Sequence, residues 1–174
     1  MLVLNLKKIR TAQERFDLAY GPGEFEADPD VYRIVEPMTL AFDVFKDKDQ
    51  FRLAGSLKTR LELLCSRCLD PLPWPVDVTF DVRYHPRTTA ASAEEVEIEE
   101  DDLTDAFYEK DEIDLGQLIH EQLMLSVPMK PLCSGACQGL CPLCGTNLNR
   151  ETCECKRDWV DPRLAALKNL KLEN

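Results

Sequence analysis

The chain lacks several features that would place it in a common functional class. It has no apolar run close to the roughly 20 residues that a membrane-spanning helix needs. It contains only 2 histidines, and we recognise no phosphate-binding loop, no serine, histidine and aspartate set and no inward carboxylate pair. We therefore expect neither an enzyme nor a membrane protein, and no small-molecule substrate. Residues 1–8 have no apolar core followed by small residues, as an export signal would, so we expect a cytoplasmic location and reduced thiols.

Basic residues are also in deficit, because 21 Lys and Arg face 32 Asp and Glu, for a net charge of -11. The excess acid is local: residues 94–114 hold 12 acidic residues and the single base Lys110. We interpret residues 87–112 as an acidic loop, since so many like charges repel one another. The rest of the chain is formally neutral and can still carry a basic face, so overall charge does not exclude a nucleic-acid partner.

Cysteine, in contrast, is abundant, and six of the 8 lie between Cys133 and Cys155. The two-residue spacing in Cys141-Pro142-Leu143-Cys144 lets one tight turn direct two thiolates at a tetrahedral ion. A second pair must then come from Cys133 or Cys137 upstream and from Cys153 or Cys155 downstream. The sequence predicts a closed, structural zinc site, favoured over disulfides because the thiols are expected to stay reduced. The preferred ligands, with one residue on either side of the central turn, are Cys137, Cys141, Cys144 and Cys155.

A further pair, Cys65 and Cys68, has the same spacing but lies far from this cluster in the sequence. A redox pair would be expected at the start of a helix, whereas here a strand precedes the pair and a proline-rich stretch follows it. Three alternatives remain open. The pair completes the C-terminal site, binds an ion of its own with two C-terminal cysteines, or consists of reduced loop thiols. Cys65, Cys68, Cys133 and Cys153 are thus further candidate ligands.

Hydrophobic residues alternate with polar residues from Met38 to Tyr84, which predicts an antiparallel meander or partly open barrel with one buried face. On the other face we expect Arg52, Lys58 and Arg60 to pair with Asp77 or Asp81 across strands. Residues 1–36 are expected to be an irregular, partly extended entry. A helix over about residues 114–127 should start at Asp114 and pack on the sheet.

The predicted fold class is therefore α+β, with two parts. Residues 1–128 form the β domain with the acidic loop and the packed helix. Residues 129–174 form a small cysteine-rich zinc lobe, and Asp161-Pro162 starts a C-terminal helix after it.

Several of these segments together resemble one protein family. They are Cys65-Ser66-Arg67-Cys68-Leu69 after a meander, Leu125-Ser126-Val127-Pro128 ending a helix, Gly139-Leu140-Cys141-Pro142-Leu143-Cys144-Gly145, and Asp161-Pro162-Arg163-Leu164. In this order the chain is similar to the YceD family over nearly its whole length. The resemblance implies a non-enzymatic role in the accumulation of large-subunit ribosomal RNA in bacteria and plastids.

The resemblance also suggests partners, namely large-subunit rRNA or its precursor, and ribosomal or assembly proteins. Residues 130–174 carry seven bases and five acids, only +2, and a four-thiolate zinc centre contributes -2, so electrostatic attraction to RNA is weak. We expect the chain either to contact a small segment of RNA or to be recruited to the ribosome precursor by another protein. The alternative function is a protein-interaction adaptor that uses Trp74 or the acidic segment. A thiol enzyme using Cys65 and Cys68 is a third hypothesis. Candidate RNA or partner contacts are Arg67, Asn147, Asn149, Arg150, Lys156, Arg157, Arg163 and Lys168.

Overall fold

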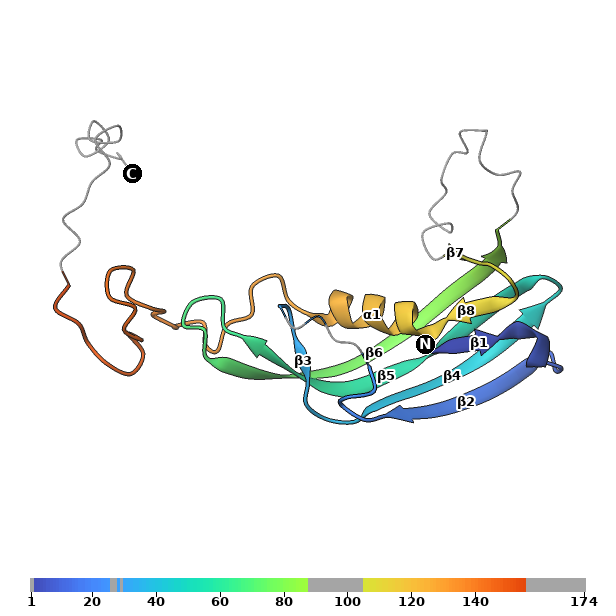
Figure 1. Cartoon of the computed structure of the whole chain (residues 1–174), viewed down its shortest axis with the longest axis horizontal. Helices are drawn as coiled ribbons and strands as arrows, with labels where there is room; N and C mark the ends of the chain where they lie inside the picture. The colour runs from blue at the N-terminus through green and yellow to red at the C-terminus, as the bar shows by residue number, and fades with distance from the viewer. Residues whose placement is uncertain (1, 26–27, 29, 88–104, 156–174) are drawn as a thin grey trace, which may run out of the picture.

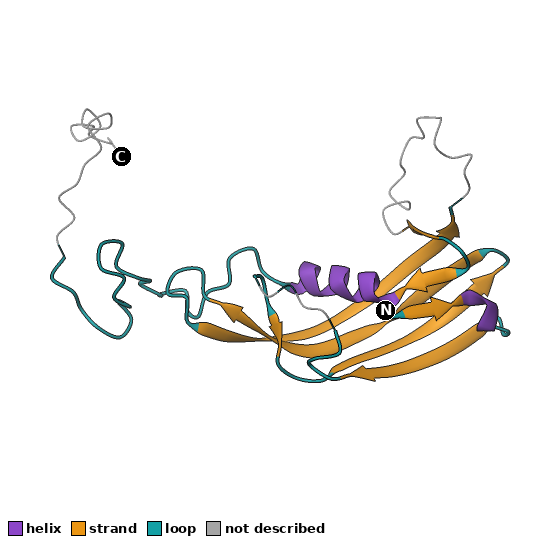
Figure 2. Ribbon diagram, in the orientation of Figure 1, coloured by secondary structure: helices purple, strands orange, loops and turns teal. Residues whose placement is uncertain are grey.

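A curved β-sheet forms the body of the protein in the computed structural model, which describes residues 2–25, 28, 30–87 and 105–155 (Figures 1 and 2). The sheet has six strands in the order β2-β4-β5-β6-β7, with β3 paired to β5 off this path. A two-stranded sheet of β1 and β8 lies beside it. The strands are β1 (Val3–Asn5), β2 (Gln13–Tyr20), β3 (Arg33–Ile34), β4 (Met38–Asp47), β5 (Gln50–Leu64), β6 (Pro71–Pro86), β7 (Asp105–Tyr108) and β8 (Glu112–Asp114), with a short 3-10 helix, η1, at Leu6–Lys8.

The predicted meander is confirmed in β4, β5 and β6, which pair antiparallel along nearly their whole lengths. Alternate residues of these strands, among them Leu40, Leu53 and Leu57, are fully buried on the inner face. On the outer face Lys58 pairs with Asp77 at 2.9 Å and Arg52 pairs with Asp81, as expected, whereas Arg60 pairs with Glu36 at 3.4 Å and with neither aspartate. Cross-strand ion pairs therefore neutralise much of the charge on this face.

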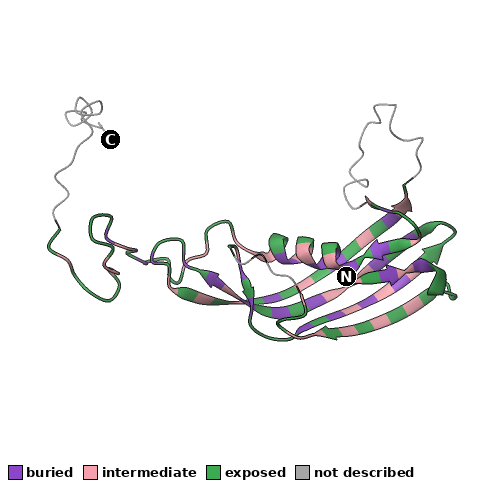
Figure 3. Cartoon of the chain, viewed as in Figure 1, coloured by how far each residue is buried: buried purple, intermediate pink, exposed green. Residues whose placement is uncertain are grey.

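Helix α1 (Leu115–Ser126) covers the inner face of the sheet (Figures 1 and 3). The carboxylate of Asp114 accepts a hydrogen bond from the backbone N–H of Gln117 at 3.1 Å, which confirms the predicted N-cap. The helix presents Leu115, Leu118, Ile119 and Leu123 to the core, where all four are buried. No helix among the residues described is long and apolar enough to cross a membrane.

Trp74, in the proline-rich stretch that follows Cys68, lies within β6, where its indole N–H donates to the carbonyl of Ser126 at 3.1 Å. Pro73 and Pro75 flank it in the same strand. Strand β7 pairs with β6 only from Arg83 onward, so this part of β6 is an edge in the described chain, and an edge tolerates residues that lack an N–H.

Two segments are more ordered than the sequence indicated. The expected irregular entry contains β2, which pairs with β4 over eight residues and stacks Phe16 on Phe42. The stretch interpreted as acidic loop contains β7, which runs parallel to β6, and the beginning of β8. Arg87 donates to Glu109 at 2.6 Å, so part of the acidic charge is paired. Residues 88–104 and the expected C-terminal helix lie outside the described residues.

Candidate metal centre

All eight cysteines gather in two groups of four. The chain that leaves α1 runs to the tip of the hairpin formed by β5 and β6 and continues beyond it (Figure 1). The first group contains Cys65, Cys68, Cys133 and Cys137, and the second contains Cys141, Cys144, Cys153 and Cys155. Within each group the sulfur atoms all lie within 4.8 Å of one another. Each group offers four thiols and could hold one metal ion.

Each group is built on a cysteine turn, and the two turns share one hydrogen-bond pattern. In the first, the N–H of Leu69 donates to the carbonyl of Cys65 at 2.9 Å, and the N–H of Cys65 donates to the carbonyl of Asp70 at 2.9 Å. In the second, Gly145 donates to Cys141, and Cys141 donates to Thr146, both at 2.8 Å. The residue after each second cysteine has a positive φ, 59° for Leu69 and 76° for Gly145. The local backbone therefore aims both thiols of a turn to the same side.

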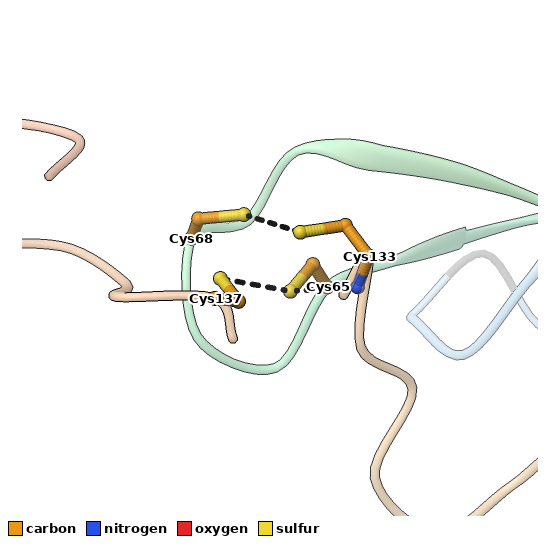
Figure 4. A group of neighbouring side chains, drawn as sticks. All are labelled: Cys65, Cys68, Cys133 and Cys137. Carbon is orange, nitrogen blue, oxygen red and sulfur yellow. Dashed lines mark hydrogen bonds between the residues drawn. The ribbon is translucent and has the colours of Figure 1, made fainter. Parts of the chain in front are cut away.

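The first group joins parts of the chain that are far apart in sequence (Figure 4). Cys65 and Cys68 come from the connection between β5 and β6, and Cys133 and Cys137 come from the segment after α1. The sulfur of Cys65 lies 3.9 Å from that of Cys137, and the sulfur of Cys68 lies 3.7 Å from that of Cys133. The N–H of Ser66 also donates to the carbonyl of Pro131 at 2.8 Å. Three of the four residues are buried, and Cys133 is exposed.

The second group is local in sequence and more open. Its four cysteines lie within residues 141–155, and Cys144 and Cys155 are exposed. The isolated bridge between Leu140 and Asn147 closes the loop that contains the turn. The hydroxyl of Thr146 lies 3.1 Å from the sulfur of Cys144.

In each group hydrogen bonds lower the pKa of two thiols and favour their thiolate form. The neighbouring cysteine sulfurs and burial raise the pKa of the other two, which are Cys68 and Cys133 in the first group and Cys153 and Cys155 in the second. The N–H of Cys133 lies 3.4 Å from the sulfur of Cys65 and, with other backbone N–H groups of the turn, lowers the pKa of Cys65 to about 6. The hydroxyl and backbone N–H of Thr146 likewise lower the pKa of Cys144 to about 6. The side-chain amide of Asn149 donates to the sulfur of Cys137 at 3.3 Å and lowers its pKa. A thiolate is the form of cysteine that binds metal.

Four of the residues expected to contact RNA are engaged within the protein itself. Arg67 donates to the carbonyl of Cys137 at 2.8 Å, and Arg150 pairs with Asp70 at 3.2 Å. Asn147 donates to the same Asp70 at 3.0 Å. Asn149 accepts from the N–H of Gln138 at 2.8 Å, in addition to its contact with a cysteine sulfur. Their partners are Cys137 of the first group and two residues close to its members, Asp70 and Gln138. The other four, Lys156, Arg157, Arg163 and Lys168, lie outside the described residues.

The four preferred metal ligands do not come together as one set. Cys141, Cys144 and Cys155 share the second group, whereas Cys137 lies in the first. The structure places two C-terminal cysteines, Cys133 and Cys137, beside the turn at Cys65 and Cys68, so these four residues could hold an ion of their own. The sequence contained a signal for this division, because the cysteines form four close pairs, 65/68, 133/137, 141/144 and 153/155, and each site uses two whole pairs.

These observations define a class of protein, a curved and mostly antiparallel sheet with one four-cysteine group at the β5–β6 connection and a second in the segment that follows. A family profile described as "Large ribosomal RNA subunit accumulation protein YceD" matches residues 53–171, a region that includes both groups. The chain therefore belongs to the YceD family.

Curated relatives agree with this assignment. The chain is 29% identical over 156 residues to "Large ribosomal RNA subunit accumulation protein YCED homolog 1, chloroplastic" of Arabidopsis thaliana, with 78% of this chain and 49% of the relative covered. It is 27% identical to the protein of the same name in Zea mays, over 69% of this chain and 49% of the relative. It is 32% identical to the uncharacterized protein YlbN of Bacillus subtilis, over 62% of this chain and 59% of the relative. The chain thus spans about half the length of the plant relatives, and no solved structure matches it.

Proposed function

We propose that this chain is a non-enzymatic factor of large ribosomal subunit biogenesis. In this proposal it promotes accumulation or processing of large-subunit rRNA through contacts with the rRNA, with ribosomal proteins, or with both. The observation that carries the proposal is membership of a family described by the accumulation of this RNA. The chain would act in the cytoplasm, whereas the plant relatives are named chloroplastic.

The cysteine groups support a structural role for metal within this function. Four thiols fill all the positions of a tetrahedral ion, whereas a catalytic zinc ion keeps one position free for water or substrate. We propose that zinc maintains the shape of the cysteine-rich segment. In this view the thiols are ligands, and the thiol-enzyme hypothesis becomes the weakest of the three.

The described charges favour a limited RNA contact. Arg52, Lys58 and Arg60 on the outer face of the sheet pair with Asp81, Asp77 and Glu36. Arg67 and Arg150 are occupied by contacts near the cysteines. Among the cations expected to contact RNA, Lys156, Arg157, Arg163 and Lys168 lie outside the described residues and remain the candidates for phosphate.

A second candidate function is an adaptor that binds ribosomal or assembly proteins without touching RNA. A surface hollow of about 540 Å³ at β7 and the start of α1 favours it. Its lining combines the aromatic residues Tyr84, Phe107 and Tyr108 with the carboxylates of Glu112, Asp114 and Glu121 and with the ion pair of Arg87 and Glu109, so it is acidic on balance. Such a surface repels phosphate and suits a basic protein segment.

Ultraviolet crosslinking of the tagged protein in its own cells, followed by sequencing of RNA that copurifies under denaturing conditions, separates the two candidates. Direct action predicts enrichment of large-subunit precursor rRNA. It also predicts loss of that enrichment when Lys156, Arg157, Arg163 and Lys168 are all replaced by alanine. The control variant replaces Lys7, Lys8, Arg10 and Arg33 by alanine, which changes the net charge by the same amount.

The adaptor function predicts a different result, namely that crosslinked RNA is absent while ribosomal proteins still copurify after nuclease treatment. In either case, depletion of the protein should lower large-subunit rRNA relative to small-subunit rRNA. An unchanged ratio would contradict the role in rRNA accumulation itself.

A further inference from the structure

We infer that the chain holds two zinc ions, one in each cysteine group, and that contacts made by Asn147 and Asn149 couple the two sites. The inference rests on the structural zinc proposed above. It specifies two complete ligand sets in place of one and adds an energetic link between them.

The separation of the sulfur atoms fits metal and does not fit disulfides. At a zinc–sulfur distance of about 2.3 Å, two ligands on one tetrahedron are about 3.8 Å apart. The sulfurs of the first group are separated by 3.7 Å and 3.9 Å along the two contacts drawn in Figure 4. A disulfide would bring two sulfurs to about 2.05 Å. The first group thus has the spacing of an assembled tetrahedral site.

The second group follows the same construction. Its turn reproduces both backbone hydrogen bonds and the positive φ of the first turn. The remaining two ligands again come from one closely spaced pair, Cys153 and Cys155. Because each group has a full set of four thiols, neither needs a ligand from the other.

The two ions would have different effects on the structure. The first would connect the β5–β6 tip to the segment after α1, across 65 to 72 residues, and so hold the end of α1 in place. The second would close only the loops between residues 141 and 155. Loss of the first ion therefore disturbs the attachment of the helix, whereas loss of the second releases the outer loops alone.

Coupling between the sites follows from the hydrogen bonds that join them. The N–H of Leu140, next to Cys141, donates to the carbonyl of Arg67 in the first turn at 3.0 Å. Asn147, just beyond the second turn, donates to Asp70, which follows the first turn. Asn149 reaches the sulfur of Cys137. An ion that orders one site therefore places partners for the other, and this linkage must raise both affinities by the same factor.

Native mass spectrometry of the full-length protein, purified with zinc under reducing conditions, tests the stoichiometry. We expect two zinc ions per chain, and one ion in each of the variants Cys133→Ser and Cys144→Ser. Cys133 is chosen in the first group because it is exposed, so its replacement leaves the buried ligands in the core. Titration of the unaltered, zinc-free protein with cobalt gives a second readout that requires no variant. We expect the absorption of cobalt in tetrahedral four-sulfur coordination to reach its maximum at two equivalents of cobalt per chain.

Competition with a zinc chelator tests the coupling. Asn149→Ala should weaken zinc binding about tenfold, as expected when a hydrogen bond to a ligand is lost. Gln138→Ala is the matched control, because Gln138 takes part in the hydrogen bond to Asn149 only through its backbone N–H. In the Cys144→Ser variant, the ion that remains in the first site should also exchange faster than in the unaltered protein.

One ion per chain that depends on Cys141 and Cys144, with no effect of Cys133→Ser, would overturn the two-site inference and leave structural zinc intact. Bound iron in place of zinc would overturn both the two-site inference and the proposal of structural zinc. Disulfides, which lower the mass of the chain by two hydrogens each, would do the same. Two ions with equal chelator competition in the Asn149→Ala variant and in the control would overturn the role given to Asn149, and an unchanged exchange rate of the remaining ion in Cys144→Ser would overturn the coupling. None of these results depends on RNA, so failure here is distinct from failure of the proposed role in rRNA accumulation.

Discussion

Leu69 is strained in a way that its counterpart Gly145 is not. Both follow the second cysteine of a turn and both have a left-handed backbone, with φ of 59° and 76°. A non-glycine residue in this region costs roughly 1–2 kcal/mol, whereas glycine adopts it freely. The side chain of Leu69 is 58% exposed, so little packing offsets the strain.

This difference predicts opposite effects of two substitutions. Leu69→Gly should raise the free energy of unfolding by up to about 1 kcal/mol, since it removes the strain. Gly145→Ala should lower it by about 1 kcal/mol, although nothing lies within 4 Å of the new Cβ, because only the backbone conformation opposes it. Urea unfolding of the zinc-loaded protein, followed by circular dichroism, measures both. A loss of stability in Leu69→Gly would show that the exposed leucine makes a contact that the strain argument omits.

Strand β5 depends on a glycine at its centre. Gly55 lies between Phe42 on β4 and Phe80 on β6 in the pairing register. A Cβ at this position would come within 2.3 Å of the carbonyl oxygen of Ala41 and 2.4 Å of the Cβ of Phe42. The strands approach so closely here that only glycine fits.

Gly55→Ala should therefore destabilise the sheet by about 2–3 kcal/mol, because β4 must move away from β5. Gly23→Ala serves as the control, since no atom lies within 4 Å of its added Cβ and the expected change is close to zero. Thermal unfolding of the two variants in parallel gives the comparison. Equal melting temperatures would contradict the close approach of β4 to β5.

Helix α1 depends on its N-cap in a similar way. Asp114→Ala removes the acceptor for the N–H of Gln117 and should cost about 1 kcal/mol of stability. Asp114→Asn keeps a side-chain acceptor and should retain most of that energy. Chemical unfolding monitored by far-ultraviolet circular dichroism separates the two variants. If both lost the same amount, the negative charge and not the hydrogen bond would be the stabilising feature.

At the scale of the whole molecule, Tyr84 links the sheet to the helix. Burial of its ring between them, with a smaller effect of the carboxylates of Glu121 and Asp114, raises the pKa of Tyr84 to about 12. An unfolded tyrosine ionises near pH 10, so the folded state keeps its proton where the unfolded state loses it. The stability contributed by neutral Tyr84 is therefore complete below pH 10 and is lost as the pH rises towards 12.

The unaltered protein should thus lose about 2 kcal/mol of stability relative to Tyr84→Phe between pH 9 and pH 12. Comparison of the two proteins cancels the ionisation of other groups in the same range. Urea unfolding at several pH values measures the difference. A constant gap between the two curves would show that Tyr84 ionises normally in the folded protein.

Most of the meander could be predicted from the sequence because its signal is local. Alternation of apolar and polar residues in β4, β5 and β6 reports which face is buried, and Asp114 marks the helix start through its own short side chain. Strand β2 was missed although Phe16, Leu18 and Tyr20 alternate in it, because it opens with three polar residues, and β7 was missed because four residues beside an acidic run give no clear pattern. Both are ordered by pairing with strands already in place.

The local sequence could not predict which cysteine pairs combine into one group. Their spacing in four close pairs already indicates tetrahedral metal sites, because a tight turn determines how two neighbouring thiols point. The choice of which pairs combine is not local, since it requires the β5–β6 connection to meet the chain that leaves α1. That meeting depends on the length of the hairpin and on the packing of the helix along it. Residue types and spacing were thus enough to propose metal binding, whereas the composition of the two groups was decided by tertiary structure, which alone brings Cys65 and Cys68 to Cys133 and Cys137.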